Sequence, residues 1–359
     1  MEKYRVGIVG ATGMVGQRFI SLLKDHPWFE VNCVAASARS AGKTYREAVG
    51  ERWAFSWEIP EKVAGMTVVD AADIDEVSKH VDFVFCAVDM KKDEIRALEE
   101  AYAKHEIPVV SNNSACRGIE DVPMVVPEIN ADHLAVIEAQ KKRLGTKSGF
   151  IAVKPNCSIQ SYVPALTPLL DFEPEKVSVC TYQAISGAGK TFKTWPEMVD
   201  NVIPYIGGED EKSENEPLKL WGHVEDGKIV NATLPVISAQ CLRVACSDGH
   251  MAAASVKFKN KPSKEVMIER WNSFKGRAQE LKLPSAPEHY LTYCEEDNRP
   301  QTKLDRMTEN GMGVTIGRLR EDTIFDYKFV SLSHNTLRGA AGGAVLMAEL
   351  LCAEGYMDR

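Results

Sequence analysis

GIVGATGMVG, residues 7–16, joins the first strand-like run of the chain to its first helical pattern. Glycines at positions 10, 13 and 16 allow the backbone to turn tightly, and they allow a pyrophosphate to approach main-chain N–H groups at a helix N-terminus. The spacing differs from the G-x-G-x-x-G form, so the position directly after a strand carries the prediction of a dinucleotide site. A tight strand-to-helix turn without a ligand is the alternative.

Short apolar runs and helical patterns alternate through the first 110 residues. The expected strands are Arg5–Val9, Val31–Ala36, Phe83–Ala87 and Pro108–Val110, and the expected helices are Gln17–Lys24 and Glu94–Lys104. Alternation of this kind predicts crossover units and a parallel sheet that is covered on both faces. We therefore expect an α/β domain of the Rossmann type at the N-terminus.

The pattern changes near residue 150, where a last strand of the first domain is expected at Phe150–Val153. The longer strands expected after it alternate more clearly, and they are Lys176–Gln183, Met251–Phe258, Gly313–Leu319 and Phe325–Leu332. Alternation predicts an antiparallel or mixed sheet with one covered face. Residues 207–217 (GGEDEKSENEP) are acidic and polar, which predicts a loop or an exposed lid.

Two domains follow from this change of pattern. Residues 1–153 form the expected nucleotide-binding domain, which a C-terminal helix over residues 335–359 rejoins. Residues 154–334 form the expected α+β catalytic and oligomerisation domain with a mixed sheet. Small residues crowd the expected helix Leu337–Leu351, which indicates close packing against another backbone or a ligand.

Composition excludes several classes of function. The formal net charge is −8 over 359 residues, which argues against a nucleic-acid partner or an anionic membrane surface. No apolar run reaches the roughly 18 residues of a membrane span, and the early strand leaves no room for a signal peptide. The nine cysteines are scattered, so reduced thiols in the cytoplasm are expected. Cys241 and Cys246 lack the spacing of zinc ligands, so no metal is expected.

The choice of cofactor is argued from the residues that follow the second strand. An NAD site usually places an acidic residue there to bind the ribose 2′-hydroxyl. This chain has Ser37, Arg39 and Ser40 instead. A guanidinium and hydroxyls bind a 2′-phosphate that a carboxylate would repel, so NADP(H) is favoured. The alternative is that Arg39 is a solvated loop residue.

Cys157 lies in KPNCSIQ, residues 154–160, between a buried strand and an apolar helical stretch, Tyr162–Leu170. A helix N-terminus favours a thiolate, and its N–H groups can hold an oxyanion. A nucleophilic cysteine needs a proton-transfer partner. His250 enters a strand after an Asp-Gly turn, and Arg243 leads into that turn as a possible anion clamp. The alternatives are a buried structural cysteine and an ordinary loop histidine.

Seven motifs together resemble one enzyme family. They occur in order between residues 10 and 343, and they are GATGMVG, SNNSACR, KPNCSIQ, TYQAISGAGK, EPLK, RVACSDGH and NTLRGAAGG. In this combination the chain is similar to the aspartate-β-semialdehyde dehydrogenases, in particular to their archaeal and fungal-like branch. The resemblance implies NADPH-dependent reductive dephosphorylation of L-aspartyl 4-phosphate to aspartate semialdehyde and phosphate. That reaction serves lysine, threonine and methionine biosynthesis.

The resemblance also implies roles for individual residues. Cys157 is the expected nucleophile, His250 the acid/base, and Gln183 a residue that orients the acyl intermediate. On the substrate side it implies Arg243 for the α-carboxylate, Glu216 for the ammonium, Arg117 and Lys219 for the phosphate, and Asn156. On the NADP side it implies Gly10, Thr12, Gly13, Met14, Val15, Ser37, Arg39, Ser40, Ser186, Gly187 and Asn335. A homodimer or homotetramer is expected from the same likeness.

Two other functions stay open at this stage. A malonyl-CoA reductase can share this scaffold and its cysteine, whereas Glu216 favours a substrate with a free ammonium. The second is a non-catalytic nucleotide-sensing protein, which the presence of both Cys157 and His250 disfavours.

Overall fold

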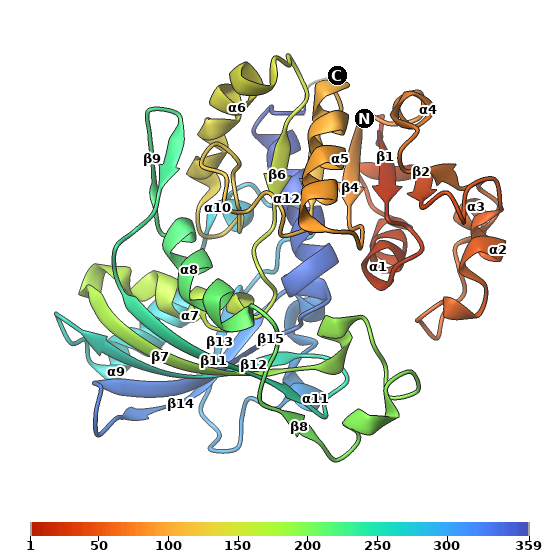
Figure 1. Cartoon of the computed structure of the whole chain (residues 1–359). Coiled ribbons are helices and arrows are strands. Elements are labelled where there is room, and N and C mark those ends of the chain that lie inside the picture. Colours follow the sequence, from red (N-terminus) through yellow and green to blue (C-terminus); the bar gives the residue numbers. More distant parts are fainter. Residues whose placement is uncertain (1, 358–359) are drawn as a thin grey trace.

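The computed structural model describes residues 2–357, which form two sheets stacked one above the other in Figure 1. The first sheet has six parallel strands in the order β3-β2-β1-β4-β5-β6. Its strands are β1 (Tyr4–Val9), β2 (Phe29–Ala36), β3 (Val69–Asp70), β4 (Phe83–Cys86), β5 (Val109–Ser111) and β6 (Ile151–Val153). This is the strand order of a doubly wound dinucleotide-binding fold, so the expected Rossmann-type domain is confirmed.

Helices cover both faces of this sheet. They are α1 (Met14–Leu23), α2 (Tyr45–Val49), α3 (Glu61–Ala64), α4 (Ile74–Ser78), α5 (Lys92–Lys104), α6 (Ile137–Leu144) and, from the far end of the chain, α12 (Gly342–Ala353). Every residue of α12 from Gly342 to Leu351 is buried, as expected for a helix that is apolar on all sides. The helix packs in one hydrophobic cluster with β1 and α1, so the C-terminus returns to the first sheet (Figure 1).

The second sheet is mixed and has seven strands in the order β13-β14-β15-β12-β7-β11-β8. These are β7 (Pro174–Gln183), β8 (Val202–Ile203), β11 (Val236–Val244), β12 (His250–Phe258), β13 (Leu291–Cys294), β14 (Val314–Glu321) and β15 (Tyr327–Ser333). The accompanying helices are α7 (Val163–Leu166), α8 (Glu209–Leu220), α9 (Lys264–Ser273), α10 (Arg277–Glu280) and α11 (Thr302–Asp305), with a hairpin of β9 (His223–Glu225) and β10 (Lys228–Val230). The mixed sheet expected in the second half is confirmed.

One face of the mixed sheet is open in the single chain. Along β7 the residues alternate between buried and more exposed positions, and Ser178 and Tyr182 point to the exposed side. The register places Ser178 between Ser255 of β12 and Ser238 of β11. The three serines form one row of small side chains across this face.

The prediction of a loop or an exposed lid over the acidic stretch 207–217 is wrong. Residues 209–217 of this stretch form the larger part of α8. Its buried side consists of Glu209, Ser213, Pro217, Lys219 and Leu220. The spacing is helical, but three of these five residues, Glu209, Ser213 and Lys219, are charged or polar. Apolar periodicity therefore could not reveal the helix.

The helical stretch expected over Tyr162–Leu170 is also interrupted. Only Val163–Leu166 is α-helical, and a 3-10 segment, Thr167–Phe172, follows it. Pro164 and Pro168 lie at the start of each piece and cannot donate the main-chain hydrogen bonds of a continuous helix. Within residues 2–357 no helix is both long and apolar enough to cross a membrane.

Candidate active site

Cys157 and His250 meet between the two sheets. Cys157 lies in the turn after β6, at the carboxyl edge of the parallel sheet, and His250 is the first residue of β12. The distance from Cys157 Sγ to His250 Nε2 is 3.4 Å. Because 93 residues separate the two in sequence, only the packing of one sheet on the other brings them together.

The register of the mixed sheet gathers the remaining polar groups at the same edge. β7 and β11 run parallel and pair Gln183 with Arg243 at their carboxyl ends. β12 runs against β7 and pairs His250 with Ser333, the last residue of β15. The edge that carries Gln183, Arg243 and His250 therefore faces the carboxyl edge of the parallel sheet, where ligands of doubly wound folds bind.

The hydrogen bonds of His250 define its tautomer. The main-chain N–H of Ala184 donates to His250 Nδ1 at 3.0 Å, so in the neutral ring the proton resides on Nε2, which faces Cys157. Burial, followed by the charge of Arg243, holds the pKa of His250 well below its usual value. The ring is therefore placed as a neutral hydrogen-bond donor to Cys157.

The thiol of Cys157 is partly accessible. Burial and then the charge of Glu209 raise its pKa, whereas Lys154, Arg117 and Arg243 lower it. The helix expected to favour the thiolate is only a three-residue 3-10 turn, Ile159–Ser161. A turn of this length has few aligned peptide dipoles and so contributes little to the stability of a thiolate. Cations rather than a helix terminus therefore counter the cost of the thiolate.

Glu209, which the sequence analysis did not single out, connects two of the expected site residues. Its carboxylate accepts hydrogen bonds from Asn156 Nδ2 at 2.9 and 3.0 Å, from Gln183 Nε2 at 3.2 Å and from Lys212 Nζ at 2.8 Å. Its side chain is largely buried. Glu209 thereby fixes the amide planes of Asn156 and Gln183 beside Cys157.

Arg117 and Glu216 form an ion pair in the cleft. The distance from Arg117 Nη1 to Glu216 Oε1 is 2.9 Å, and Glu216 Oε2 accepts from the main-chain N–H of Asn156 at 2.6 Å. A hollow of about 590 Å³ opens beside the pair. Among residues 2–357, Arg117 Nε and both side-chain amide atoms of Asn112 are buried and have no hydrogen-bond partner, so they are available to a polar ligand.

The ammonium of Lys219 is directed elsewhere. It donates to the main-chain carbonyls of Arg117, Ile119 and Val122 at 2.7, 2.7 and 2.9 Å. Burial lowers the pKa of Lys219 to about 8. With three acceptors for its three protons, this side chain holds the loop that carries Arg117 and has no proton left for a phosphate.

Arg243 and Gly187 lie close to the histidine. Arg243 Nη1 donates to the carbonyl of Ala184 at 2.7 Å, and the guanidinium is buried. A Cβ atom on Gly187 would lie 3.0 Å from Arg243 Nη1 and 3.1 Å from His250 Nε2. The absence of a side chain at Gly187 therefore keeps the space in front of Arg243 and His250 open.

The glycine turn has the shape of a phosphate cradle. Gly10 has φ +92°, and a Cβ there would lie 2.3 Å from the carbonyl oxygen of Ala87, so another residue would not fit. α1 begins at Met14, and Gly13 provides no side-chain cap. The first N–H groups of a helix have no partner within the helix, so those of Met14 and Val15, next to Thr12, are free to bind a pyrophosphate.

The other residues expected on the cofactor side fall at two places. Ser37, Arg39 and Ser40 follow β2 at the carboxyl edge of the parallel sheet, and Arg39 is exposed. Asn335 donates from Nδ2 to Ser186 Oγ at 2.9 Å and accepts from the N–H of Gly249 at 2.8 Å. This second group adjoins His250 through Gly249.

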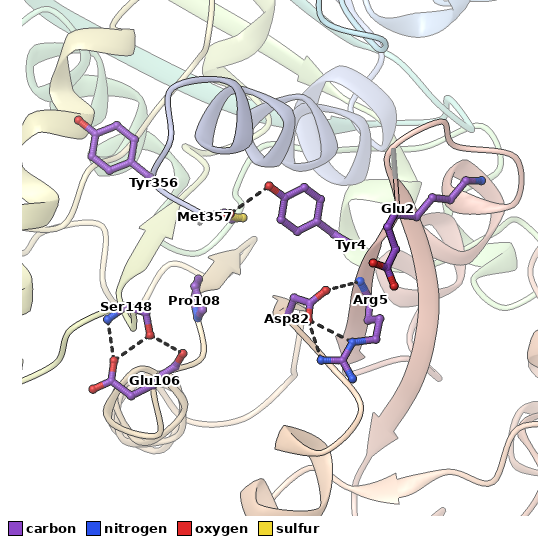
Figure 2. Close-up of a pocket in the computed structure, with 10 residues that line it drawn as sticks. Glu2, Tyr4, Arg5, Asp82, Glu106, Pro108, Ser148, Tyr356 and Met357 are labelled. Atoms are coloured by element: carbon purple, nitrogen blue, oxygen red, sulfur yellow. Dashed lines mark hydrogen bonds and ion pairs between the residues drawn. The ribbon is translucent and has the colours of Figure 1, made fainter. Parts of the chain in front are cut away.

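Figure 2 shows a different hollow, of about 520 Å³, at the amino end of β1. Arg5 and Asp82 pair on one side of it, and Glu106 accepts from Ser148 on the other (Figure 2). This is the edge of the sheet opposite to the one at which ligands of such folds bind. Among the residues described, no group of three or more His, Cys, Asp or Glu side chains is arranged to hold a metal ion.

Comparisons with known proteins identify relatives over nearly the whole chain. Residues 5–137 match the family model described as semialdehyde dehydrogenase, NAD binding domain, and residues 166–338 match semialdehyde dehydrogenase, dimerisation domain. The chain is 44% identical to the aspartate-semialdehyde dehydrogenase of Archaeoglobus fulgidus, over 98% of this chain and 99% of the relative. It is 42% identical to that of Schizosaccharomyces pombe, over 98% and 99%. The crystal structure of the Candida albicans enzyme with NADP superposes with a TM-score of 0.88 at 36% identity, covering 99% of this chain and 100% of that one.

Proposed function

The chain belongs to the aspartate-semialdehyde dehydrogenase family, and on this premise we propose that it reduces L-aspartyl 4-phosphate to L-aspartate 4-semialdehyde and phosphate with NADPH. The observation that carries the proposal is the 3.4 Å approach of Cys157 Sγ to His250 Nε2, with the buried cation Arg243 and the cleft cation Arg117 beside it. A thiol, a hydrogen-bond donor and two cations suit a substrate that is both an acyl group and an anion.

In the first step the Cys157 thiolate attacks the acyl carbon. The C–O bond to phosphate breaks, a thioester forms on Sγ, and the leaving phosphate takes up one proton from solvent. His250 donates a hydrogen bond from Nε2 to the thiolate and then to the oxyanion that develops next to it. The amide of Gln183, which Glu209 holds in place, is proposed to orient the acyl group.

NADPH, when bound, supplies the hydride that reduces the acyl carbon. The resulting oxyanion collapses to the aldehyde and expels the Cys157 thiolate, so the second half of the reaction needs no proton from the histidine. The neutral Nε2–H tautomer that the Ala184 N–H favours is therefore sufficient for the role that we propose for His250. Gly10, Thr12, Gly13, Met14 and Val15 would hold the pyrophosphate; Ser37, Arg39 and Ser40 the 2′-phosphate; and Ser186, Gly187 and Asn335 the nicotinamide end.

The ion pair between Arg117 and Glu216 supports the choice of substrate. Separating the pair leaves a guanidinium and a carboxylate in need of partners. L-Aspartyl 4-phosphate carries a phosphate for Arg117, an ammonium for Glu216 and an α-carboxylate for Arg243. Asn156 binds Glu216 through its main-chain N–H and so completes this side. Malonyl-CoA has no ammonium that could pair with Glu216.

Lys219, the remaining residue expected at the substrate site, is proposed to act indirectly, by holding the loop that carries Arg117. Its three bonds to the carbonyls of residues 117, 119 and 122 support a role in holding Arg117 rather than in touching phosphate. We propose a cytoplasmic homo-oligomer, with a dimer formed through the open face of the mixed sheet as its basic unit. The family model for that part of the chain, described as a dimerisation domain, supports this assembly.

The test is the phosphate-dependent reduction of NADP by L-aspartate semialdehyde, measured by absorbance for the wild type and for Cys157→Ala. We expect activity that requires phosphate, and its loss in the variant with the affinity for NADP unchanged. Malonyl-CoA with NADPH is the control substrate. If well-folded wild type binds NADP but turns over malonyl-CoA only, or neither substrate, the proposed function is wrong.

A further inference from the structure

Lys154 is a buried lysine three residues before the nucleophile. It is 3% exposed, and its Nζ donates to the carbonyl of Pro155. Within residues 2–357 no carboxylate pairs with it, in contrast to Arg338, a buried cation near the site that Glu128 neutralises. An unpaired buried ammonium is costly, so a chain that retains one needs a negative charge that forms close by.

The fold packs Lys154 and Cys157 against one segment near the C-terminus. The main-chain N–H of Lys154 is bound to Ser111 of β5. A Cβ on Gly343 would lie 3.6 Å from Lys154 Cδ, and a Cβ on Gly339 would lie 2.9 Å from Cys157 Cβ. Gly339 and Gly343 lie four residues apart, on either side of a kink at Ala340, so the lysine and the cysteine both pack against the same short segment of the chain.

Most of the other charged side chains that face the pair already have a partner of opposite charge: Arg117 pairs with Glu216, Glu209 with Lys212, and Arg338 with Glu128. His250 is neutral. Among residues 2–357, Arg243 has no carboxylate partner. Arg243 is reserved for the α-carboxylate of the substrate in the proposed function. Lys154 is then the remaining cation that can compensate a negative charge on Cys157 Sγ.

We propose that Lys154 provides the counter-charge of the Cys157 thiolate and so sets the pH at which the nucleophile ionises. When Cys157 Sγ loses its proton, Lys154 Nζ carries one, so the thiolate and the ammonium together have no net charge. Lys154 therefore acts on the reaction only through the ionisation of Cys157, and it is a positioning residue rather than a catalytic one. The proposal rests on the proposed role of Cys157 as the nucleophile.

The pKa shifts of the two groups agree with this coupling. Burial lowers the pKa of Lys154 to about 7, and the charge of Cys157 raises it. Burial raises the pKa of the Cys157 thiol, and Lys154 is the first of the cations that lower it. Each group therefore favours the charged form of the other, as opposite charges in a poorly solvated site do.

The test compares the pH dependence of alkylation of Cys157 by iodoacetamide, a neutral reagent, in wild type and Lys154→Met. Mass spectrometry of the peptide that contains Cys157 separates this thiol from the other eight cysteines. Methionine preserves the length of the side chain and removes its charge. An opposite charge nearby typically shifts a pKa by about 1–3 units. We therefore expect the midpoint to rise by about one unit or more and the rate at pH 7 to fall roughly tenfold.

Three comparisons separate this effect from a structural one. Lys104→Met, at an exposed position in α5, should leave the midpoint unchanged. The KM for NADP of Lys154→Met should equal that of wild type, while its kcat should recover at high pH. Lys154→Gln should show the same upward shift, and it replaces the methionine variant if that variant does not fold.

An unchanged midpoint in a folded Lys154 variant would overturn the proposal, whatever the turnover. Rapid alkylation of wild type without any turnover of aspartate semialdehyde would instead contradict the proposed function and leave the charge pairing intact. The two failures are therefore distinguishable.

Discussion

At the scale of single residues, the reactive centre depends on which group holds each proton. The Ala184 N–H occupies Nδ1 of His250, and addition of a second proton to the ring would break that hydrogen bond. Burial and Arg243 add to the same effect on the pKa of the ring. In the mechanism that we propose, the centre therefore combines a neutral histidine with a cysteine thiolate whose negative charge lysine and arginine side chains compensate.

We expect His250 to stay neutral between pH 6 and 8, because its pKa is held well below the usual value. Histidine-selective ¹⁵N NMR should show one ring with a protonated Nε2 and an unprotonated Nδ1 that does not titrate in this range. The unfolded chain takes up a proton near its ordinary pKa of about 6.5. Stability from this site is therefore present above that pH and falls as the pH drops below it.

A resonance that titrates near the ordinary pKa and is missing from His250→Gln would contradict the assignment. The glutamine variant is a useful control because its amide can place an N–H near the position of Nε2. It should retain more activity than His250→Ala.

At the scale of elements, α8 supplies two carboxylates that contact residues of the site. Glu209 and Glu216 lie seven residues apart in it, about two turns of a helix. Glu209 contacts Asn156 and Gln183, and Glu216 contacts Arg117. The helix therefore couples residues of the parallel sheet to residues of the mixed sheet.

Glu209→Gln should lower kcat and leave the affinity for NADP unchanged. The substitution keeps the shape of the side chain but weakens the hydrogen bonds that hold Asn156 and Gln183. A hydrogen bond to a charged group contributes roughly 1.5–3 kcal/mol, so we expect a loss of about tenfold or more. Lys212→Met, which removes only the outer partner of Glu209, should have a smaller effect. Steady-state kinetics check this, and equal kcat values for wild type and Glu209→Gln would refute it.

At the scale of the whole molecule, the two sheets have different roles. The parallel sheet presents a nucleotide cradle and Cys157, and the mixed sheet presents His250, Gln183 and Arg243 from one edge. The opposite face of the mixed sheet is open in the single chain, and Ser255, Ser178 and Ser238 form a row of small side chains across it. That geometry suits close packing against the same face of a second chain.

Ser178→Arg should prevent assembly of the dimer. The arginine would place a long charged side chain at the centre of the open face, where two copies of it would meet around a twofold axis. Size-exclusion chromatography with light scattering should show monomers for this variant. Lys257→Arg, at an exposed position near the end of β12, is the matched control and should assemble like wild type. A Ser178→Arg variant that remains dimeric would place the interface elsewhere.

Much of this architecture was predictable from the sequence. Alternating strands and helices predicted the parallel sheet, because each apolar run there is buried on both faces. The expectation that small residues after Leu337 pack closely is also confirmed, since Gly339 and Gly343 lie against Cys157, Lys154 and the backbone at Arg338. The helix α8 was missed because its buried side carries Glu209 and Lys219, whose hydrogen-bond partners Asn156, Gln183 and the carbonyls of residues 117, 119 and 122 are distant in sequence, which no local pattern reports.

The sequence by itself determined the fold class, the glycine turn and the family, since strand and helix periodicity, tight turns and ordered motifs are local properties of the chain. It also singled out Cys157 and His250 as a pair. Only the tertiary structure decided the tautomer of His250, the direction of Lys219, the role of Glu209 and the isolation of Lys154. Those four features depend on burial and on partners that folding brings together, and the free energy of a buried charge is set by its surroundings rather than by its neighbours in sequence.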